Sequence, residues 1–220
     1  MVIKHFTCNM LAENCYVVSD ETKECVIIDC GALYKEENAA ITNYIQSSGL
    51  IPKHLLCTHG HFDHCIGNGF IYNAFGLKPE VHIDDEFLMT KMREQTLEIL
   101  GINLPMEVPP VGKYLSDSDT ISFGSHTLTI LHTPGHTPGG VCYYCEAEKI
   151  CFSGDTLFRM SIGRTDFERG SYEEIVNSLQ HVLASLPSDT KVYPGHGPVT
   201  TIADEVRYNP YFMLKDYGNH

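Results

Sequence analysis

Four residues of metal-binding type lie within six positions in the segment "HGHFDH": His59, His61, Asp63 and His64. Histidine nitrogens and aspartate oxygens are the donors that zinc and related divalent ions accept in catalytic sites. In an extended loop His59 and His61 point to the same side, because side chains alternate with a period of two. A helix that begins near Asp63 would turn Asp63 and His64 toward a neighbouring point. The spacing therefore favours two adjacent ions over one.

Three further segments each carry a β-like run into a tight turn with one ligand-type residue. They are "LTILHTPGHTPGG" with His136, "KICFSGDTLF" with Asp155, and "KVYPGHGPVT" with His196. Glycine and proline beside each residue fix the geometry of the turn. If these turns meet at one sheet edge, we expect two ligand sets with Asp155 as the bridge: His59, His61 and His136 for one ion, and Asp63, His64 and His196 for the other. Of the remaining histidines only His132 is near enough in sequence to support a ligand, and a polar residue at a strand end is the better interpretation.

The elements that must position these turns follow a simple order. Three β-rich runs occupy the first thirty residues, and the short run "KHLLCT" leads directly into the histidine cluster. Helical patterns cover residues 35–49, 84–100 and 171–186, and strand patterns return from residue 121 to the final run "KVYPG". The order of β-rich half, helix, β-rich half and helix indicates an α/β fold, with two mixed sheets packed together and helices outside.

Composition limits the possible classes of protein. The length of 220 residues predicts one domain over residues 1–220, and 43% apolar residues suffice for a buried core. No stretch resembles a signal peptide or a membrane span, so we expect a cytoplasmic protein without membrane association. The net charge of −13 and the lack of any run of Lys or Arg argue against a nucleic-acid partner.

The nine cysteines are expected to be reduced thiols. Their number is odd, and several lie in apolar strand-like runs, where a free cysteine behaves as a small hydrophobe. Cys142 and Cys145 form a CxxC pair, but strand positions three apart point to opposite faces. The histidine cluster has no cysteine in ligand register, whereas structural zinc sites are usually closed and rich in thiolates. A non-enzymatic metal-binding module is therefore rejected.

Taken in order, the motifs "NCYVV", "IIDCG", HxHxDH, "TPGHTPG", "SGDTLF" and "GHGPVTTI" resemble those of the metallo-β-lactamase superfamily. The resemblance covers nearly the whole chain. It implies an αβ/βα four-layer sandwich with the metals at one edge between the sheets. In that family the aspartate equivalent to Asp29 lies near the metal site and can orient a ligand. The alternative for Asp29 is an ordinary turn residue at a strand end.

Within the superfamily, "SGDTLF", "SIGRTDFERGS" and "VRYNPY" resemble a short glyoxalase II-like group, also described as hydroxyacylglutathione hydrolase-like. The resemblance implies a hydrolase with two divalent ions, zinc first and iron or manganese as alternatives, acting on a small thioester such as S-lactoylglutathione. A hydroxide held between the ions would attack the carbonyl, since metals lower the pKa of bound water to about 7. Asp63 or Asp155 would hold it in line.

The identity of the thiol carrier stays open at this stage. Classical glyoxalase II enzymes carry a C-terminal helical domain that helps bind glutathione, but only 24 residues follow His196 in this chain of 220. Arg164 and Arg169 are candidates for binding a substrate carboxylate by paired hydrogen bonds. For Arg164 a structural pair with Asp166 is the stronger interpretation. By analogy with the family, residues 84–100 and their proline-rich exit lie over the site and shape the pocket.

Two other activities are open on the same fold. Persulfide dioxygenases share the fold and a similar "GRTDF" segment, but use one iron held by two histidines and an aspartate, here His59, His136 and Asp155. The intact His196 in "YPGHGP" and the "NPY" tail favour the two-metal hydrolase. A lactonase would use the same two ions on a cyclic ester. For either hydrolase we expect a monomer or a homodimer.

Overall fold

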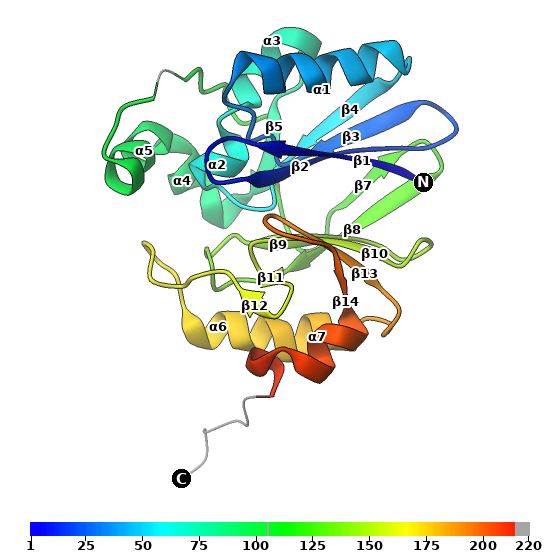
Figure 1. Ribbon diagram of the computed structural model, residues 1–220, viewed down its shortest axis with the longest axis vertical. Helices are drawn as coiled ribbons and strands as arrows, with labels where there is room; N and C mark the ends of the chain where they lie inside the picture. Colours follow the sequence, from blue (N-terminus) through cyan, green and yellow to red (C-terminus); the bar gives the residue numbers. More distant parts are fainter. Residues whose placement is uncertain (105, 214–220) are drawn as a thin grey trace.

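Two mixed β-sheets face each other, and helices cover the outer side of each (Figure 1). The computed structural model describes residues 1–104 and 106–213. The layers run helix, sheet, sheet, helix, so the predicted α/β, αβ/βα four-layer sandwich is confirmed.

The first sheet has six strands in sequential order, antiparallel from β1 to β3 and parallel from β3 to β6. Its strands are β1 (Val2–Cys8), β2 (Glu13–Ser19), β3 (Glu24–Ile28), β4 (Ile51–Leu56), β5 (Pro79–His82) and β6 (Lys113–Leu115). The parallel order brings the carboxyl ends of β3, β4 and β5 to one edge. That edge carries Asp29 and the loop that begins at Cys57.

The second sheet runs in the order β14-β13-β10-β9-β8-β7, with β10 and β13 parallel and the other pairs antiparallel. Its strands are β7 (Thr120–Phe123), β8 (His126–His132), β9 (Val141–Cys145), β10 (Ile150–Gly154), β13 (Lys191–Pro194) and β14 (Thr200–Thr201). A small ribbon, β11 (Leu157–Phe158) and β12 (Ser161–Ile162), follows β10. The segments after β8, β10 and β13 carry His136, Asp155 and His196.

Alternation along the strands divides the apolar residues between two layers. In β3, Val26 and Ile28 face the core between the sheets, while Ile27 packs toward the outer helices. Cys145 likewise lies in the core between the sheets and Cys142 on the outer side of the second sheet, so the predicted divergence of this CxxC pair is confirmed. All nine cysteines are buried and free.

The helices pack on the outer faces of the sheets. Ile41 and Ile45 of α1 and Ile71 of α3 pack on the first sheet, and Leu179 and Ile202 pack on the second. The α-helices are α1 (Lys35–Ser47), α2 (Phe62–Cys65), α3 (Asn68–Phe75), α4 (Glu86–Thr90), α5 (Met92–Leu100), α6 (Tyr172–Asn177) and α7 (Ile202–Tyr208). Short 3-10 turns cover Ile83–Asp85, Leu183–Ser185 and Pro210–Phe212, and a π-helical turn covers Ser178–Val182.

Two helices differ from their predicted form. The pattern over residues 84–100 is divided at Lys91, whose φ of −104° and ψ of 21° separate α4 from α5. The pattern over residues 171–186 is α-helical only as far as Asn177 and continues as the π-helical and 3-10 turns. Neither break has a glycine or proline to announce it, so tertiary packing decides where the α-helical hydrogen bonds stop.

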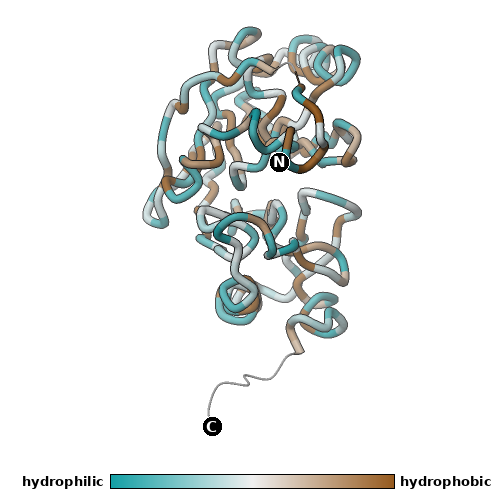
Figure 2. The backbone as a smooth tube through the Cα atoms, turned by 90° about the vertical axis from the view of Figure 1, so that its left-hand side faces the viewer, coloured by the Kyte–Doolittle hydropathy of each residue, from teal (hydrophilic) through white to brown (hydrophobic). Residues whose placement is uncertain are grey.

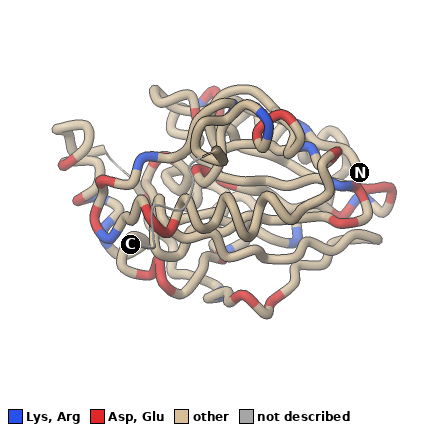
Figure 3. The backbone as a smooth tube through the Cα atoms, turned by 90° about the horizontal axis from the view of Figure 1, so that it is seen from below, with Lys and Arg blue, Asp and Glu red and all other residues tan. Residues whose placement is uncertain are grey.

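Segments of hydrophobic residues run through both halves of the molecule (Figure 2). Lysines and arginines are scattered among the more numerous acidic residues (Figure 3). Over residues 1–104 and 106–213, no helix is both long and apolar enough to cross a bilayer.

Candidate metal centre

The loop after β4 carries the histidine cluster into a buried position. His61 has extended backbone angles and occupies the N-cap position of the short helix α2, so the helix begins one residue before Asp63, close to where the spacing placed it. His59, His61, Asp63 and His64 are each at most 8% exposed. The loop thus holds four polar side chains inside the protein, where each needs a partner.

The first predicted ligand set is brought together in space. The ring nitrogens of His59, His61 and His136 all lie within 4.8 Å of one another. His61 Nδ1 is 2.9 Å from His136 Nε2, although the two residues are 75 positions apart in sequence. The turn after β8 therefore delivers His136 onto the loop after β4.

The second set is brought together beside the first. Donor atoms of Asp63, His64 and His196 lie within 4.8 Å of one another, with His196 Nε2 3.3 Å from Asp63 Oδ2. Asp155 lies between the sets: Oδ1 is 3.3 Å from His64 Nε2, and Oδ2 is 3.6 Å from His136 Nε2. All seven predicted residues form one cluster.

Two atoms of the cluster are buried and have no hydrogen-bond partner among residues 1–104 and 106–213. They are His59 Nε2 and Asp155 Oδ1. A buried polar atom left unpaired costs roughly 1–3 kcal/mol, and native proteins rarely tolerate one without a reason. Both atoms are of the type that binds a divalent cation, so the residues present fit a metal-binding site.

Three of the histidines are oriented by a contact at Nδ1, on the side of the ring away from the cluster. His64 Nδ1 lies 3.0 Å from Asp29 Oδ2, His136 Nδ1 donates to the Arg164 carbonyl oxygen at 2.7 Å, and His196 Nδ1 donates to the Leu11 carbonyl oxygen at 3.1 Å. Histidine ligands of metals typically donate the second ring N–H in this way, which fixes the tautomer and the ring orientation. In each case Nε2 is left facing the cluster.

Asp29 makes contacts that fit both interpretations considered for it. It follows β3 with a left-handed φ of 50°, and its carboxylate accepts the backbone N–H and the hydroxyl of Thr58, each at 2.7 Å. The same carboxylate faces His64 Nδ1. It therefore joins the ends of β3 and β4 and also touches a member of the cluster.

The pKa values divide the histidines into two kinds. Burial, reinforced by the neighbouring His136, lowers the pKa of His61 to about 3, and burial also lowers the pKa of His59 well below its usual value. For His64 burial acts in the same direction, but the carboxylates of Asp155, Asp63 and Asp29 outweigh it and raise the pKa. Neutral imidazole is the form that binds metals, so His59 and His61 present lone pairs at neutral pH.

The two candidate arginines are not equivalent. Arg164 pairs with Asp166 through two hydrogen bonds of 2.6 and 2.7 Å, which lowers the pKa of Asp166 to about 2. Arg164 also stacks on Phe167 at 4.2 Å, and Phe167 lies edge-on to His61 at 4.9 Å. The structural pair weighed against a substrate role for Arg164 is therefore present. Arg169 stacks on Phe87 of α4 at 4.7 Å.

The side chains that hold these loops were not predicted from the sequence. Asp85 is fully buried and accepts hydrogen bonds from Gly60, Thr137 and Gly139, while Gln95 bonds to the backbone of the loop after β4. Asp85 appears in the sequence only as an acidic residue at a helix start. An internal Gln in the α5 pattern gives no more specific signal.

His132 lies apart from the seven-residue cluster. Its ring stacks on His82 at 4.4 Å, and its Nε2 donates to the Pro138 carbonyl oxygen at 2.9 Å. His82, Asp84 and His132 have possible ligand atoms within 4.8 Å of one another, but Asp84 is exposed and the set shares no residue with the seven-residue cluster. The contact with Pro138 instead supports the turn that carries His136.

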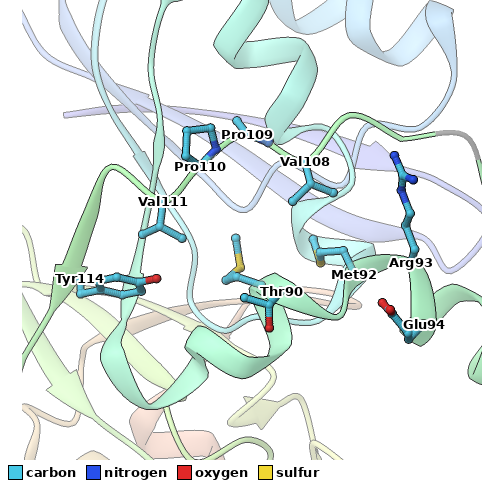
Figure 4. Close-up of a pocket in the computed structure, with 10 residues that line it drawn as sticks. Thr90, Met92, Arg93, Glu94, Val108, Pro109, Pro110, Val111 and Tyr114 are labelled. Atoms are coloured by element: carbon cyan, nitrogen blue, oxygen red, sulfur yellow. The ribbon is translucent and has the colours of Figure 1, made fainter.

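A cavity of about 620 Å³ separates α4 and α5 from the segment that follows them (Figure 4). Met89, Met92, Val108, Pro110 and Tyr114 form much of its wall. None of the seven clustered residues lines it. Residues 84–100 and their proline-rich exit thus shape a pocket together, but it is distinct from the histidine cluster.

Known proteins match this chain over most of its length. A family model described as the metallo-beta-lactamase superfamily matches residues 9–196. The chain belongs to this superfamily. A Haemophilus influenzae protein named hydroxyacylglutathione hydrolase GloC is 34% identical over 92% of this chain and 94% of its own length, which confirms the resemblance to the glyoxalase II-like group.

Solved structures of the superfamily agree. The BLEG-1 B3 metallo-beta-lactamase is 31% identical, with a TM-score of 0.89 over 97% of this chain and all of that one. TTHA1623, solved in a di-iron-bound form, is 36% identical, with a TM-score of 0.83 over 94% of this chain and 99% of that one. Together with the seven-residue cluster, these metallo-β-lactamase superfamily relatives indicate a divalent-metal site.

Proposed function

We propose that this chain is a two-metal hydrolase that cleaves small-molecule thioesters, with S-lactoylglutathione as the model substrate. The observation that carries the proposal is the position of Asp155, whose two oxygens face His64 and His136 in different ligand sets. A carboxylate that bridges two sets suits two adjacent ions. We assign His59, His61 and His136 to the first ion and Asp63, His64 and His196 to the second.

Zinc is the proposed metal, with iron and manganese as alternatives, because imidazole and carboxylate ligands suit all three. When bound, two such ions lower the pKa of a water molecule to about 7 and polarise the acyl carbonyl oxygen. The chain itself supplies the alignment. To Asp63 and Asp155 we assign the role of accepting a hydrogen bond from the attacking water and holding it in line. A thioester then needs no side-chain nucleophile.

Around the cluster, individual residues are suited to orient the substrate. Phe167 lies against His61 and gives the first-ion side an apolar wall. Arg164 is engaged by Asp166, whereas Arg169 has no carboxylate partner among the described residues. We therefore propose Arg169, supported by its stacking on Phe87, as the better of the two for a substrate carboxylate.

The test is hydrolysis of S-lactoylglutathione by the zinc-loaded protein at neutral pH, with thiol release and acid formation measured separately. We expect equal amounts of both products, loss of the reaction with a chelator and loss in Asp155→Asn. A panel of thioesters with other thiol carriers then shows whether glutathione is recognised. Absence of thiol release from every thioester would overturn the proposal; a lactone cleaved instead would assign the same ions to a lactonase.

The main alternative activity is that of a mononuclear iron persulfide dioxygenase, which would use His59, His136 and Asp155. His136 Nε2 lies 3.6 Å from Asp155 Oδ2, and His59 has a ring nitrogen within 4.8 Å of a ligand atom of each, so these three residues are also close enough to share one ion. Oxygen uptake by the iron-loaded protein on addition of glutathione persulfide would support the rival. The hydrolase proposal predicts no such uptake.

A further inference from the structure

We propose that Asp85 is a positioning residue that locks the two loops of the first ion's site together. The inference rests on the proposed two-ion function and adds a residue outside the seven ligands. Asp85 closes the 3-10 turn before α4, 25 positions from Gly60 and 54 from Gly139. No atom of Asp85 belongs to the ligand sets, so any effect passes through the backbone that it holds.

The carboxylate of Asp85 contacts both loops at once. Oδ2 accepts the Gly60 N–H at 2.8 Å and the Thr137 hydroxyl at 2.8 Å, and Oδ1 accepts the Gly139 N–H at 2.7 Å. Gly60 lies between His59 and His61, and Thr137 follows His136. One side chain therefore fixes the spacing between the segments that carry all three ligands of the first ion.

Only a carboxylate satisfies these three partners. All three are donors, and the ionised side chain is an acceptor at both oxygens. An asparagine would keep one acceptor and turn its NH₂ group toward another donor, which leaves at least one buried N–H or O–H unpaired. Burial raises the pKa of Asp85, while the bonds from Thr137, Gly60 and Gly139 oppose that rise.

The two loops also approach the segment around Asp85 very closely. A Cβ on Gly139 would lie 2.6 Å from Asp85 N and 2.7 Å from Asp85 Cγ, and one on Gly60 would lie 2.7 Å from Leu88 Cβ. At Gly60 and Gly139 the two loops therefore lie so close to Asp85 and Leu88 that only glycine fits. A shift of Asp85 is transmitted directly to both loops.

Gln95 of α5 gives the first loop a second hold. Its Oε1 accepts the Phe62 N–H at 3.0 Å, and its Nε2 donates to the Gly60 carbonyl oxygen at 3.1 Å and to the Leu88 carbonyl oxygen at 2.8 Å. None of these bonds reaches the His136 loop. Of Asp85 and Gln95, only Asp85 bonds to both loops. Asp85 can therefore set the position of one loop relative to the other, whereas Gln95 supports a single loop.

The test compares Asp85→Asn with Glu94→Gln, a matched acid-to-amide change at an exposed residue of α5 that lines the cavity in Figure 4. Zinc affinities of the two sites are measured by competition with a chromophoric chelator, and the step lost in His61→Ala marks the first ion. Changes beside metal ligands typically weaken affinity 10–100-fold. We expect Asp85→Asn to weaken the zinc affinity of the first ion's site by at least about tenfold and that of the second ion's site by less than about twofold. Glu94→Gln should change neither.

Wild-type affinities for both ions in Asp85→Asn would overturn the inference, and so would equal weakening of both, which indicates general destabilisation. If Asp85→Asn does not fold, Thr137→Val decides, because it removes one of the three donors. A zinc affinity that is weakened only at the first ion's site then supports the inference. Affinities that are unchanged, or weakened equally at both sites, overturn it. Failure of the two-ion proposal is visible separately, because the wild-type protein would then show fewer than two binding steps.

Discussion

Gly195→Ala should disrupt the metal centre although it adds only one methyl group. A Cβ on Gly195 would meet Asp155 Oδ1 and would lie 2.6 Å from His64 Cε1, whereas atoms in ordinary contact lie near 3.4–4 Å. The φ of Gly195 is outside the left-handed region, so the backbone accepts alanine without strain. The clash is therefore relieved by moving Asp155 and His64, roughly 1 Å in each case, while metal–ligand distances tolerate only about 0.2 Å.

A displacement of about 1 Å at a reacting centre lowers rates by roughly 10²-fold. We therefore expect Gly195→Ala to lose at least about a hundredfold in kcat/KM for a thioester and to retain fewer than two ions per chain. The matched control is Gly197→Ala on the other side of His196, where a Cβ meets nothing within 4 Å but φ is 76°. It should lower stability by about 1–2 kcal/mol and keep both ions.

Initial rates, elemental analysis and thermal unfolding of both variants are sufficient to decide. If Gly195→Ala keeps two ions and a rate within about threefold of wild type, the reasoning from close contact at Asp155 is refuted.

The other predictions concern ligands, metal removal and pH. His61→Ala and Asp155→Ala should abolish turnover while circular dichroism shows a folded protein; retained activity contradicts the assignment. Chelation should lower the melting temperature, because Asp63 and Asp155 lose their counter-charge, and zinc should restore it; an unchanged melting temperature argues against a structural contribution of the ions. The hydrogen bond to Glu148 raises the pKa of His126, so its stabilisation is complete below the unfolded value near 6.5 and is lost as the pH rises through the folded value. His126→Gln should therefore reduce stability by about 1 kcal/mol or less at pH 6 and by a smaller amount at pH 9, where the neutral ring still stacks on Phe123; an equal deficit at both pH values would contradict this.

Much of the site was accessible from sequence because its signals are local. His59, His61, Asp63 and His64 are neighbours in the chain, and the turns with His136 and Asp155 bear glycine or proline. The layered fold was accessible for a similar reason, since alternation and helical period are read over short windows. The grouping of these turns at one sheet edge was a premise of the sequence analysis, and it holds because β8, β10 and β13 run in the same direction, so their carboxyl ends lie together.

What escaped prediction depends on long-range contacts. Asp84 and Asp85 are adjacent and look alike in "HIDDEFL", yet only Asp85 is buried against loops far away in the sequence. The break at Lys91 has neither a glycine nor a proline at that position to signal it in the sequence. β5 (Pro79–His82) and β6 (Lys113–Leu115) are too short to show a period, and their strand form comes from pairing within the first sheet. Such features are set by tertiary partners that no window of sequence contains.

The most direct test of the two-ion centre is the metal content of freshly purified, untagged protein, measured by elemental analysis and normalised to chain concentration. We predict about two zinc, manganese or iron ions per chain, in line with the two-metal mechanism, and a loss of about one ion in His196→Ala. A single iron per chain, unchanged in His196→Ala and accompanied by oxygen uptake with glutathione persulfide, would contradict it.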